Sequence, residues 1–471
     1  MYIRHNDLVI PEENPFSVCK LDRKKYADVL TELVGGFGTG FVLALNSEWG
    51  TGKTTFVKMW RQDLQNAGFD TLYFNAWEND FESNPLVAIM SELKSLSKDK
   101  TVKFKSLIKK GAVLTKNLAP AVIKALASRY IDQQTLVDGL ENASKAAAEI
   151  LEKEIEAYAN RKKQLNDFRK DLESFVNKGI GDKPVVFFID ELDRCRPSYA
   201  VEVLEHIKHF FAVSGIVFVL AIDKEQLGHA VRGVYGSEQI DASEYLRRFI
   251  DLEYSIPLPN TKHFVDHLYD FFAFDQFFKA NERLQYNRRG EEQELFLSLA
   301  EVLFDKGKLT LRQQEKVFAH ARMSLKSFSY RNYVLPSVFL LLVYLKSLKG
   351  DLYKSIQGRE ISLQDLSDKY SQIFQSLAAD EYKINSLLHL QAQLLNLYNN
   401  YIHKPYGKQL VKRSSNHEIE SMEVTSALDH SEGNHLFAEM IVRLNRDPDE
   451  QSISIEHLLN KINLTSPLVT K

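Results

Sequence analysis

The sequence has 471 residues, 44% of them hydrophobic, which is enough for two or three domains with cores of their own. Its 60 basic and 63 acidic residues give a formal net charge of −3, which excludes a strong overall positive field for nucleic acid. The two cysteines, Cys19 and Cys195, are too few for a disulfide framework or a four-thiolate zinc site, and they fit a reducing cytoplasm.

No membrane span is expected from the sequence. The first residues lack the apolar core of a signal peptide. The longest apolar run, Val334 to Leu345, has 12 residues and contains Pro336, whereas a spanning helix needs about 20 apolar residues. We therefore expect a soluble, cytoplasmic protein.

A phosphate-binding loop is predicted near the start of the chain. Residues 41–46 read as a buried strand, residues 47–52 as a glycine-bearing loop, and Thr54 as the start of a helix. Such a loop needs small residues whose N–H groups curl around phosphate oxygens, a lysine that reaches them and a hydroxyl for Mg²⁺. Gly50, Gly52, Lys53 and Thr54 meet these needs. The nucleotide-binding prediction covers Trp49, Gly50, Thr51, Gly52, Lys53, Thr54 and Thr55.

One position departs from the pattern G-x-x-x-x-G-K-[ST]. Ser47 replaces the first glycine, and serine adopts a positive φ less readily than glycine.

A long, mostly helical segment follows the second predicted strand, residues 71–74. Apolar residues recur at helical spacing from Leu136 to Phe175, among many charged residues, and no Gly or Pro lies between Leu140 and Lys178, which predicts an amphipathic helical arm there. A projecting coiled-coil arm and a helix packed along its own domain remain equally open. The segment from Leu107 to Tyr130 has lysines beside apolar residues. Ordinary packing is favoured there over contact with a membrane surface or a groove.

A second group of candidate site residues comes after this helical segment. Residues 185–189 predict a strand buried on both faces, with Asp190 at its carboxyl end. A carboxylate there can hold Mg²⁺ through water opposite the phosphate loop, and Glu191 is placed to orient the attacking water. A further buried strand, residues 216–222, ends at Asp223, which either senses the γ-phosphate or caps the next helix. Residues 252–256 predict a fifth strand.

Five short motifs resemble the successive signatures of the KAP P-loop NTPases. They are Trp49-Gly50-Thr51-Gly52-Lys53-Thr54, Asn75-Ala76-Trp77, Asp190-Glu191-Leu192-Asp193-Arg194-Cys195, Ala221-Ile222-Asp223 and Tyr245-Leu246-Arg247-Arg248. With Leu309-Thr310-Leu311-Arg312 they cover roughly residues 20–330. The departures are Ser47 for glycine, Glu191 where aspartate is usual and Arg248 where lysine is common.

The resemblance implies an α/β fold: a RecA-like parallel sheet of order 5-1-4-3-2, with a large helical insertion and a C-terminal helical region. It also implies ATP and Mg²⁺ as cofactors. Arg312 would be a sensor of the γ-phosphate, although a surface ion pair is the alternative; Arg194, Arg247 and Arg248 are weaker candidates for an arginine finger. Membrane association is common in the family, yet this chain has no predicted span. Bacterial members are linked to phage exclusion, so a defence role is an expectation.

The expected organisation has five parts. Residues 1–95 and 181–260 form the NTPase core, 96–180 the insertion, 261–375 a helical lid and 376–471 a C-terminal helical and loop region. The aromatic residues that follow Pro259 are expected to form core. Residues 403–434 are polar and predict a loop or a partly disordered segment.

The predicted function is an ATP-hydrolysing switch. Lys53, Glu191 and Arg312 would be catalytic, and Thr54 with Asp190 would hold Mg²⁺. The alternative is a nucleotide-gated scaffold that binds ATP with little turnover and recruits a separate effector. Expected partners are a second copy of the chain or such an effector, with peripheral membrane contact left open. A nucleic-acid motor is disfavoured because no basic groove or helicase motif is evident.

Overall fold

The protein is described here from a computed structural model. The structure describes residues 8–82, 84–97, 104, 107, 110, 143–177, 183–286, 291–377, 381–403, 407–415, 418–445 and 453–465. The described residues up to Leu258 form one compact unit, and those from Pro259 onward form a second.

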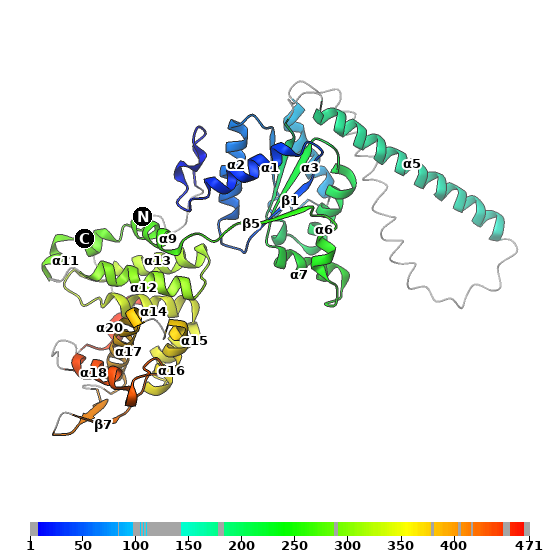
Figure 1. Cartoon of the computed structure of the whole chain (residues 1–471). Helices are drawn as coiled ribbons and strands as arrows, with labels where there is room; N and C mark the ends of the chain where they lie inside the picture. Colours follow the sequence, from blue (N-terminus) through cyan, green and yellow to red (C-terminus); the bar gives the residue numbers. More distant parts are fainter. Residues whose placement is uncertain are drawn as a thin grey trace. The chain divides into compact units, whose positions relative to one another are not determined.

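A five-stranded parallel sheet organises the first unit (Figure 1). Its strands are β1 (Val42–Asn46), β2 (Thr71–Asn75), β3 (Val185–Asp190), β4 (Ile216–Ile222) and β5 (Leu252–Ser255). Their order is β2-β3-β4-β1-β5, which is the predicted order 5-1-4-3-2 read from the opposite edge. Every residue of β3 and β4 is buried, as expected for central strands covered on both faces.

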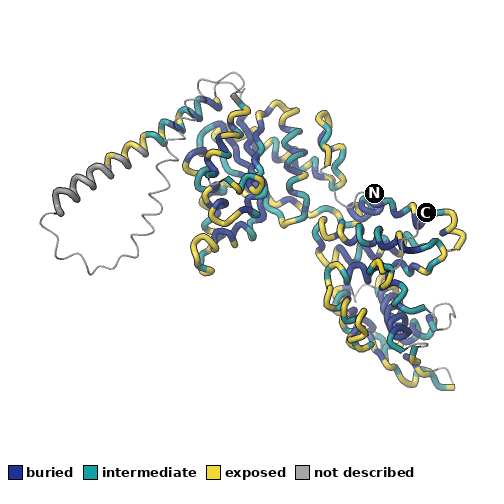
Figure 2. The backbone as a smooth tube through the Cα atoms, turned by 180° about the vertical axis from the view of Figure 1, so that it is seen from behind, coloured by how far each residue is buried: buried dark blue, intermediate teal, exposed yellow. Residues whose placement is uncertain are grey.

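Helices cover both faces of this sheet. Successive side chains of β3 point alternately to the two helix layers. Phe188 points to the layer of α1 (Lys24–Gly36) and α2 (Lys53–Asn66), where its ring lies edge-on to Trp60 at 5.2 Å. Phe187 points to the opposite layer and stacks on Phe218 of β4 at 5.3 Å. That layer contains α3 (Pro85–Leu93), α6 (Pro197–His206), α7 (Lys224–Tyr235) and α8 (Ala242–Leu246). Figure 2 shows the resulting buried interior.

The helix predicted from Leu140 to Lys178 is present as α5 (Ala143–Asn177). Its last turns belong to the core of the first unit, because Phe168, Leu172 and Phe175 are buried there. Phe168 lies edge-on to Phe210 at 6.1 Å. This end of the helix is therefore packed along its own unit. The segment from Leu107 to Tyr130 lies almost wholly outside the described residues.

No helix in the described part of the chain has both the length and the apolar character that crossing a bilayer requires.

The second unit is mainly helical. Its helices are α9 (Thr261–Phe271), α10 (Asp275–Phe278), α11 (Asn281–Tyr286), α12 (Glu292–Lys306), α13 (Leu311–Leu325), α14 (Pro336–Leu348), α15 (Gly350–Gly358), α16 (Leu363–Phe374), α17 (Glu381–Ile402), α18 (His435–Leu444) and α20 (Ile455–Ile462). The aromatic residues after Pro259 form core, as predicted: Phe274 contacts the rings of Phe296 at 4.9 Å and Phe318 at 5.4 Å. The longest apolar run forms most of the buried helix α14.

The loop prediction for residues 403–434 is wrong in part. An antiparallel pair, β6 (Val411–Arg413) and β7 (Ile419–Met422), lies within it. Ser426 is buried and donates a 2.6 Å hydrogen bond to Gln391, and Asp429 accepts one of 2.8 Å from the backbone N–H of Phe437. Two of its polar residues, Ser426 and Asp429, are therefore buried and hydrogen-bonded, which composition alone does not reveal.

Candidate functional site

The predicted phosphate loop joins β1 to α2. The helix begins at Lys53, one residue earlier than predicted, with Gly52 as its N-cap. Gly50 and Gly52 have φ values of 80° and 83°, which glycine adopts without strain. Ser47 is not among the residues with positive φ, so the serine departure from the motif places no strain on the loop.

Polar contacts within the loop fix its shape. The hydroxyls of Ser47 and Thr51 are hydrogen-bonded at 2.7 Å, and Thr51 Oγ1 also lies 2.7 Å from the carbonyl oxygen of Glu48. Lys53 Nζ donates to the carbonyls of Ser47 and, at 3.3 Å, Glu48. Lys53 is only 8% exposed, and this burial lowers its pKa, although nearby carboxylates, Asp193 foremost, oppose the shift. The lysine is thus a buried cation within the loop.

Asp190 lies at the carboxyl end of β3 and is 1% exposed. It accepts a 3.0 Å hydrogen bond from the Tyr73 hydroxyl and a 2.9 Å one from the backbone N–H of Glu191. Burial raises the pKa of Asp190, and hydrogen bonding with the side chains of Thr54 and Tyr73 acts in the opposite direction. The two residues predicted to hold Mg²⁺, Thr54 and Asp190, therefore lie close together.

Glu191 has both carboxylate oxygens engaged. Oε1 forms a 2.6 Å ion pair with Arg194, and Oε2 accepts a 3.2 Å hydrogen bond from the Asn75 side chain at the end of β2. The guanidinium of Arg194 lies over the ring of Trp77, 5.5 Å from its centre. Glu191 also has a φ of 60°, uncommon for a residue other than glycine. The motif Asn75-Ala76-Trp77 therefore holds Glu191, directly and through Arg194.

A second link joins the phosphate loop to the segment after β3. The indole N–H of Trp49 donates to Asp193 Oδ2. Asp193 is 8% exposed, its Oδ1 has no hydrogen-bond partner within the described chain, and burial raises its pKa. Sequence reasoning assigned no role to Asn75, Tyr73 or Asp193. Asn75 and Tyr73 could have been found from the predicted pairing of β2 with β3, since neighbouring parallel strands end at the same edge of the sheet.

The remaining predicted residues lie as follows. Asp223 caps α7, its carboxylate accepting a 3.2 Å hydrogen bond from the Gln226 N–H. Thr55 is exposed on the first turn of α2. Arg312 is exposed on the first turn of α13 in the second unit, and its sensor role stays a prediction. Of the finger candidates, Arg194 pairs with Glu191 in the same chain, whereas Arg247 and Arg248 are exposed.

The chain is similar to a known protein family and to several known proteins. A family model described as the KAP family P-loop domain matches residues 23–381. An uncharacterized protein of Methanocaldococcus jannaschii is 31% identical over an alignment of 181 positions, and this alignment covers 32% of this chain and 89% of that protein. Among solved structures, the ORC2 protein of Aeropyrum pernix in ADPNP–ADP complexes matches with a TM-score of 0.34 and 13% identity, over 98% of this chain and 96% of that one.

A DNA replication initiation factor matches with a TM-score of 0.28 and 13% identity, over 84% of this chain and all of that one. These two likenesses are too distant to carry an argument about function. The family match covers most of the sequence and contains both the phosphate loop and the strand that ends at Asp190. The chain therefore belongs to the KAP family of P-loop NTPases, and its candidate site is a nucleotide-binding P-loop site.

Proposed function

We propose that the protein is a Mg²⁺-dependent switch that binds and hydrolyses ATP. The observation that carries the proposal is an arrangement: a loop with Gly50 and Gly52 at positive φ leads into α2, and Thr54 at the start of α2 lies close to the buried Asp190 at the end of β3. It joins the phosphate loop to the carboxylate strand at one edge of the sheet, where ligands of open α/β sheets bind. ATP is preferred to GTP in this proposal because of the family, and no guanine-selecting N-K-x-D motif is evident.

The residues present fit Mg²⁺. The ion prefers hard oxygen ligands and keeps several of its waters, so one hydroxyl and one carboxylate suffice. Thr54 and Asp190 would hold it, and the buried Asp190 accepts hydrogen bonds but forms no ion pair within the described chain. When bound, Mg²⁺ neutralises negative charge on the phosphate oxygens.

The chain's own residues would bind the phosphates, orient the attacking water and sense the γ-phosphate. Lys53 and the loop N–H groups would hold the phosphates, and the burial of Lys53 keeps water from its ammonium group and so strengthens its charge interaction. Glu191 would orient the attacking water through Oε1 once that oxygen leaves its ion pair with Arg194, while Asn75 holds the other carboxylate oxygen. Arg312 would report the γ-phosphate to the second unit.

Lys53→Ala tests the nucleotide site. We expect it to abolish measurable ATP binding and turnover, because it removes the cation that reaches the phosphates. Lys20→Ala, which changes an exposed lysine outside the loop, is the control and should behave as wild type. Unchanged binding and turnover in Lys53→Ala would contradict the proposal.

A nucleotide-gated scaffold is the second candidate. It is favoured by the engagement of both Glu191 oxygens, which suits a bound ATP that is turned over slowly. The output would be assembly with a second copy of the chain or with a separate effector. Glu191→Gln separates the two: an ATPase cycle should stall with ATP bound, whereas a scaffold should behave as wild type.

Light scattering of purified protein with Mg²⁺, with and without ATP, provides the readout. A mass that rises with ATP and stays high in Glu191→Gln supports assembly with hydrolysis as its reset. A mass that never changes removes self-assembly from the proposal and leaves a separate effector.

The proposed setting, cytoplasmic anti-phage defence, comes from the family resemblance. Plaque formation on cells that carry wild type or Lys53→Ala tests it. Equal plaque numbers for both, and for cells without the gene, would contradict it.

A further inference from the structure

Arg23, the residue just before α1, is a buried cation whose side chain contacts the phosphate loop. It is 2% exposed. One terminal nitrogen, Nη2, donates to the carbonyl of Thr51 at 2.9 Å, and the other, Nη1, donates to the carbonyl of Gly52 at 3.3 Å. Within the described chain no carboxylate forms an ion pair with it, and its Nε has no hydrogen-bond partner. Its acceptors are therefore backbone carbonyls of the loop.

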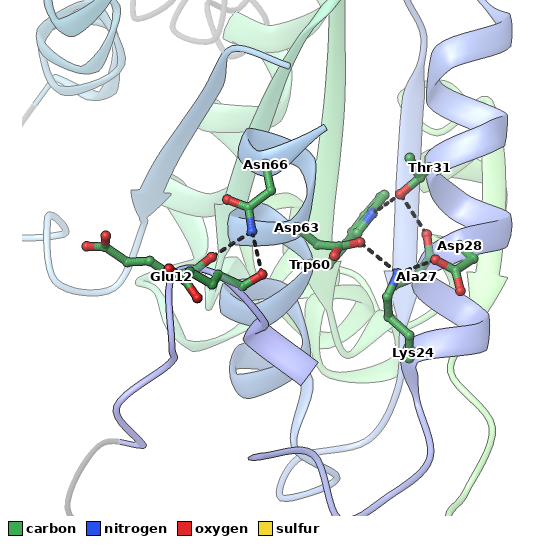
Figure 3. A network of polar contacts seen from close by, with 9 residues as sticks. Glu12, Lys24, Ala27, Asp28, Thr31, Trp60, Asp63 and Asn66 are labelled. Carbon is green, nitrogen blue, oxygen red and sulfur yellow. Dashed lines mark hydrogen bonds and ion pairs between the residues drawn. The ribbon is translucent and has the colours of Figure 1, made fainter. Parts of the chain in front are cut away.

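The helix that follows Arg23 is anchored by other contacts (Figure 3). Lys24 pairs with Asp63 of α2 at 3.1 Å, and the indole N–H of Trp60 donates to the Thr31 hydroxyl at 2.9 Å. Upstream, the Asn66 side chain donates to the carbonyl of Glu12 at 2.6 Å. These contacts hold α1 and the segment before it on α2, so the charge of Arg23 is not needed to attach α1.

A buried cation without an anion destabilises a protein, and an apolar side chain of similar length would avoid that penalty. The cation becomes favourable when an anion binds nearby. The phosphate loop is where such an anion would bind, and both carbonyls that Arg23 contacts belong to that loop.

Those carbonyls share peptide groups with loop amides. The Thr51 carbonyl is in one peptide group with the Gly52 N–H, and the Gly52 carbonyl is in one with the Lys53 N–H. A hydrogen bond from a cation to a carbonyl polarises the N–H of the same peptide group. Arg23 therefore strengthens two donors at the start of α2, where an anion binds.

We propose that Arg23 is a positioning residue that tunes the phosphate loop for di- and triphosphates, whose negative charge balances its own. The inference rests on the proposed nucleotide site and adds a residue to it. Because the loop amides and Lys53 hold the β- and γ-phosphates, Arg23 should matter for ADP and ATP and much less for AMP.

The experiment compares Arg23→Met and Arg23→Lys with wild type in the full chain. Calorimetric titration gives the Kd values of AMP, ADP and ATP, and thermal unfolding without ligand gives the midpoint. Lys24→Met is the matched control, because it removes a neighbouring link between α1 and α2 that does not contact the loop. Lys53→Ala tests the site itself.

For Arg23→Met we expect ADP and ATP to bind about tenfold to a hundredfold more weakly, the range for hydrogen bonds to a charged group. The Kd of AMP should stay close to wild type, and the ligand-free midpoint should be equal or higher. Arg23→Lys keeps the charge and should recover part of the ADP affinity. Lys24→Met should lower the midpoint and leave the Kd of ADP unchanged.

Three results would overturn the inference: an unchanged Kd of ADP in Arg23→Met, equal weakening of AMP and ADP, or the same weakening in Lys24→Met. If Arg23→Met does not fold, the ratio of the ADP and AMP Kd values in Arg23→Lys decides, and a wild-type ratio overturns it. If wild type binds no nucleotide, or Lys53→Ala binds ADP normally, the proposed function itself fails and the inference fails with it.

Discussion

Freeing Glu191 from Arg194 is expected to speed ATP turnover. Arg194→Met removes the guanidinium that pairs with Glu191 Oε1 at 2.6 Å and leaves a side chain of similar length beside Trp77. The Arg194 and Glu191 side chains are 25% and 14% exposed. The pair thus lies between an exposed ion pair, worth up to about 1 kcal/mol, and a buried one, whose loss costs about 3–5 kcal/mol.

We take about 1.5 kcal/mol as the free energy needed to open the ion pair so that Oε1 can turn to the water. Since 1.36 kcal/mol of activation free energy is tenfold in rate, kcat should rise by about tenfold in Arg194→Met. The assay is phosphate release at saturating ATP and Mg²⁺. KM should change little, because Arg194 is not proposed to contact the nucleotide.

Two controls make this prediction specific. Arg196→Met removes a neighbouring guanidinium that pairs with Asp80 at 2.8 Å rather than with Glu191, and it should leave kcat unchanged. In a Glu191→Gln background, Arg194→Met should give no gain. A kcat below wild type in Arg194→Met alone would show that Arg194 assists Glu191, and the reasoning would be refuted.

Three further perturbations test the electrostatics of both units. In Asp190→Asn, the ligand-free melting temperature should stay equal or rise, because burial disfavours the Asp190 charge. Titrations of this variant should show that Mg²⁺ no longer tightens ATP binding. A Mg²⁺ effect of wild-type size would contradict the prediction. Burial, with a smaller effect of His209, lowers the pKa of His206 to about 4. Protonation of His206 therefore favours the unfolded chain, and stability should fall by up to about 3 kcal/mol as the pH drops from about 6.5 towards 4, at 1.36 kcal/mol per pKa unit. Urea unfolding at a series of pH values should show a shallower acid slope in His206→Phe, and an identical slope would be evidence against the assignment. Glu292→Ala leaves the guanidinium of Arg283, which is 2% exposed, without its carboxylate, and should destabilise the second unit by about 3–5 kcal/mol in urea unfolding. A loss below about 1 kcal/mol would mean that the carbonyls of Tyr330 and Asn332 suffice for Arg283.

The core sheet was predictable because its signals are local. The strands β1 to β4 are short, mostly apolar runs that end in a polar residue or are followed at once by one, and the phosphate loop has its residues next to one another in the sequence. The family resemblance supplied the strand order, which periodicity alone does not give. The helix α5 was predictable from its spacing, but an apolar stripe of this kind suits a coiled coil and a packed helix equally, so the burial of Phe168 had to come from the structure.

The contacts around the site were not predictable in the same way. Trp49 and Asp193 are 144 residues apart, and the link between them depends on how the loops at the sheet edge lie. Arg23 precedes the first strand and has no motif of its own, so only burial and its loop contacts identify it. The strands β6 and β7 were missed because they are short and rich in charged residues, which is the composition of a loop.

The order of the strands also bears on how the protein is made. The Tyr73 hydroxyl on β2 donates a hydrogen bond to Asp190, 117 residues later, and the backbone N–H of Val42 on β1 donates one to Asp251, 209 residues later. At a synthesis rate of about 5–20 residues per second, β2 stays without its neighbour β3 for roughly 6–23 seconds after it is made. The apolar faces of β1 and β2 are exposed to solvent or to chaperones during that time. Folding on the ribosome should therefore be late for the sheet and should complete only when β5 has emerged.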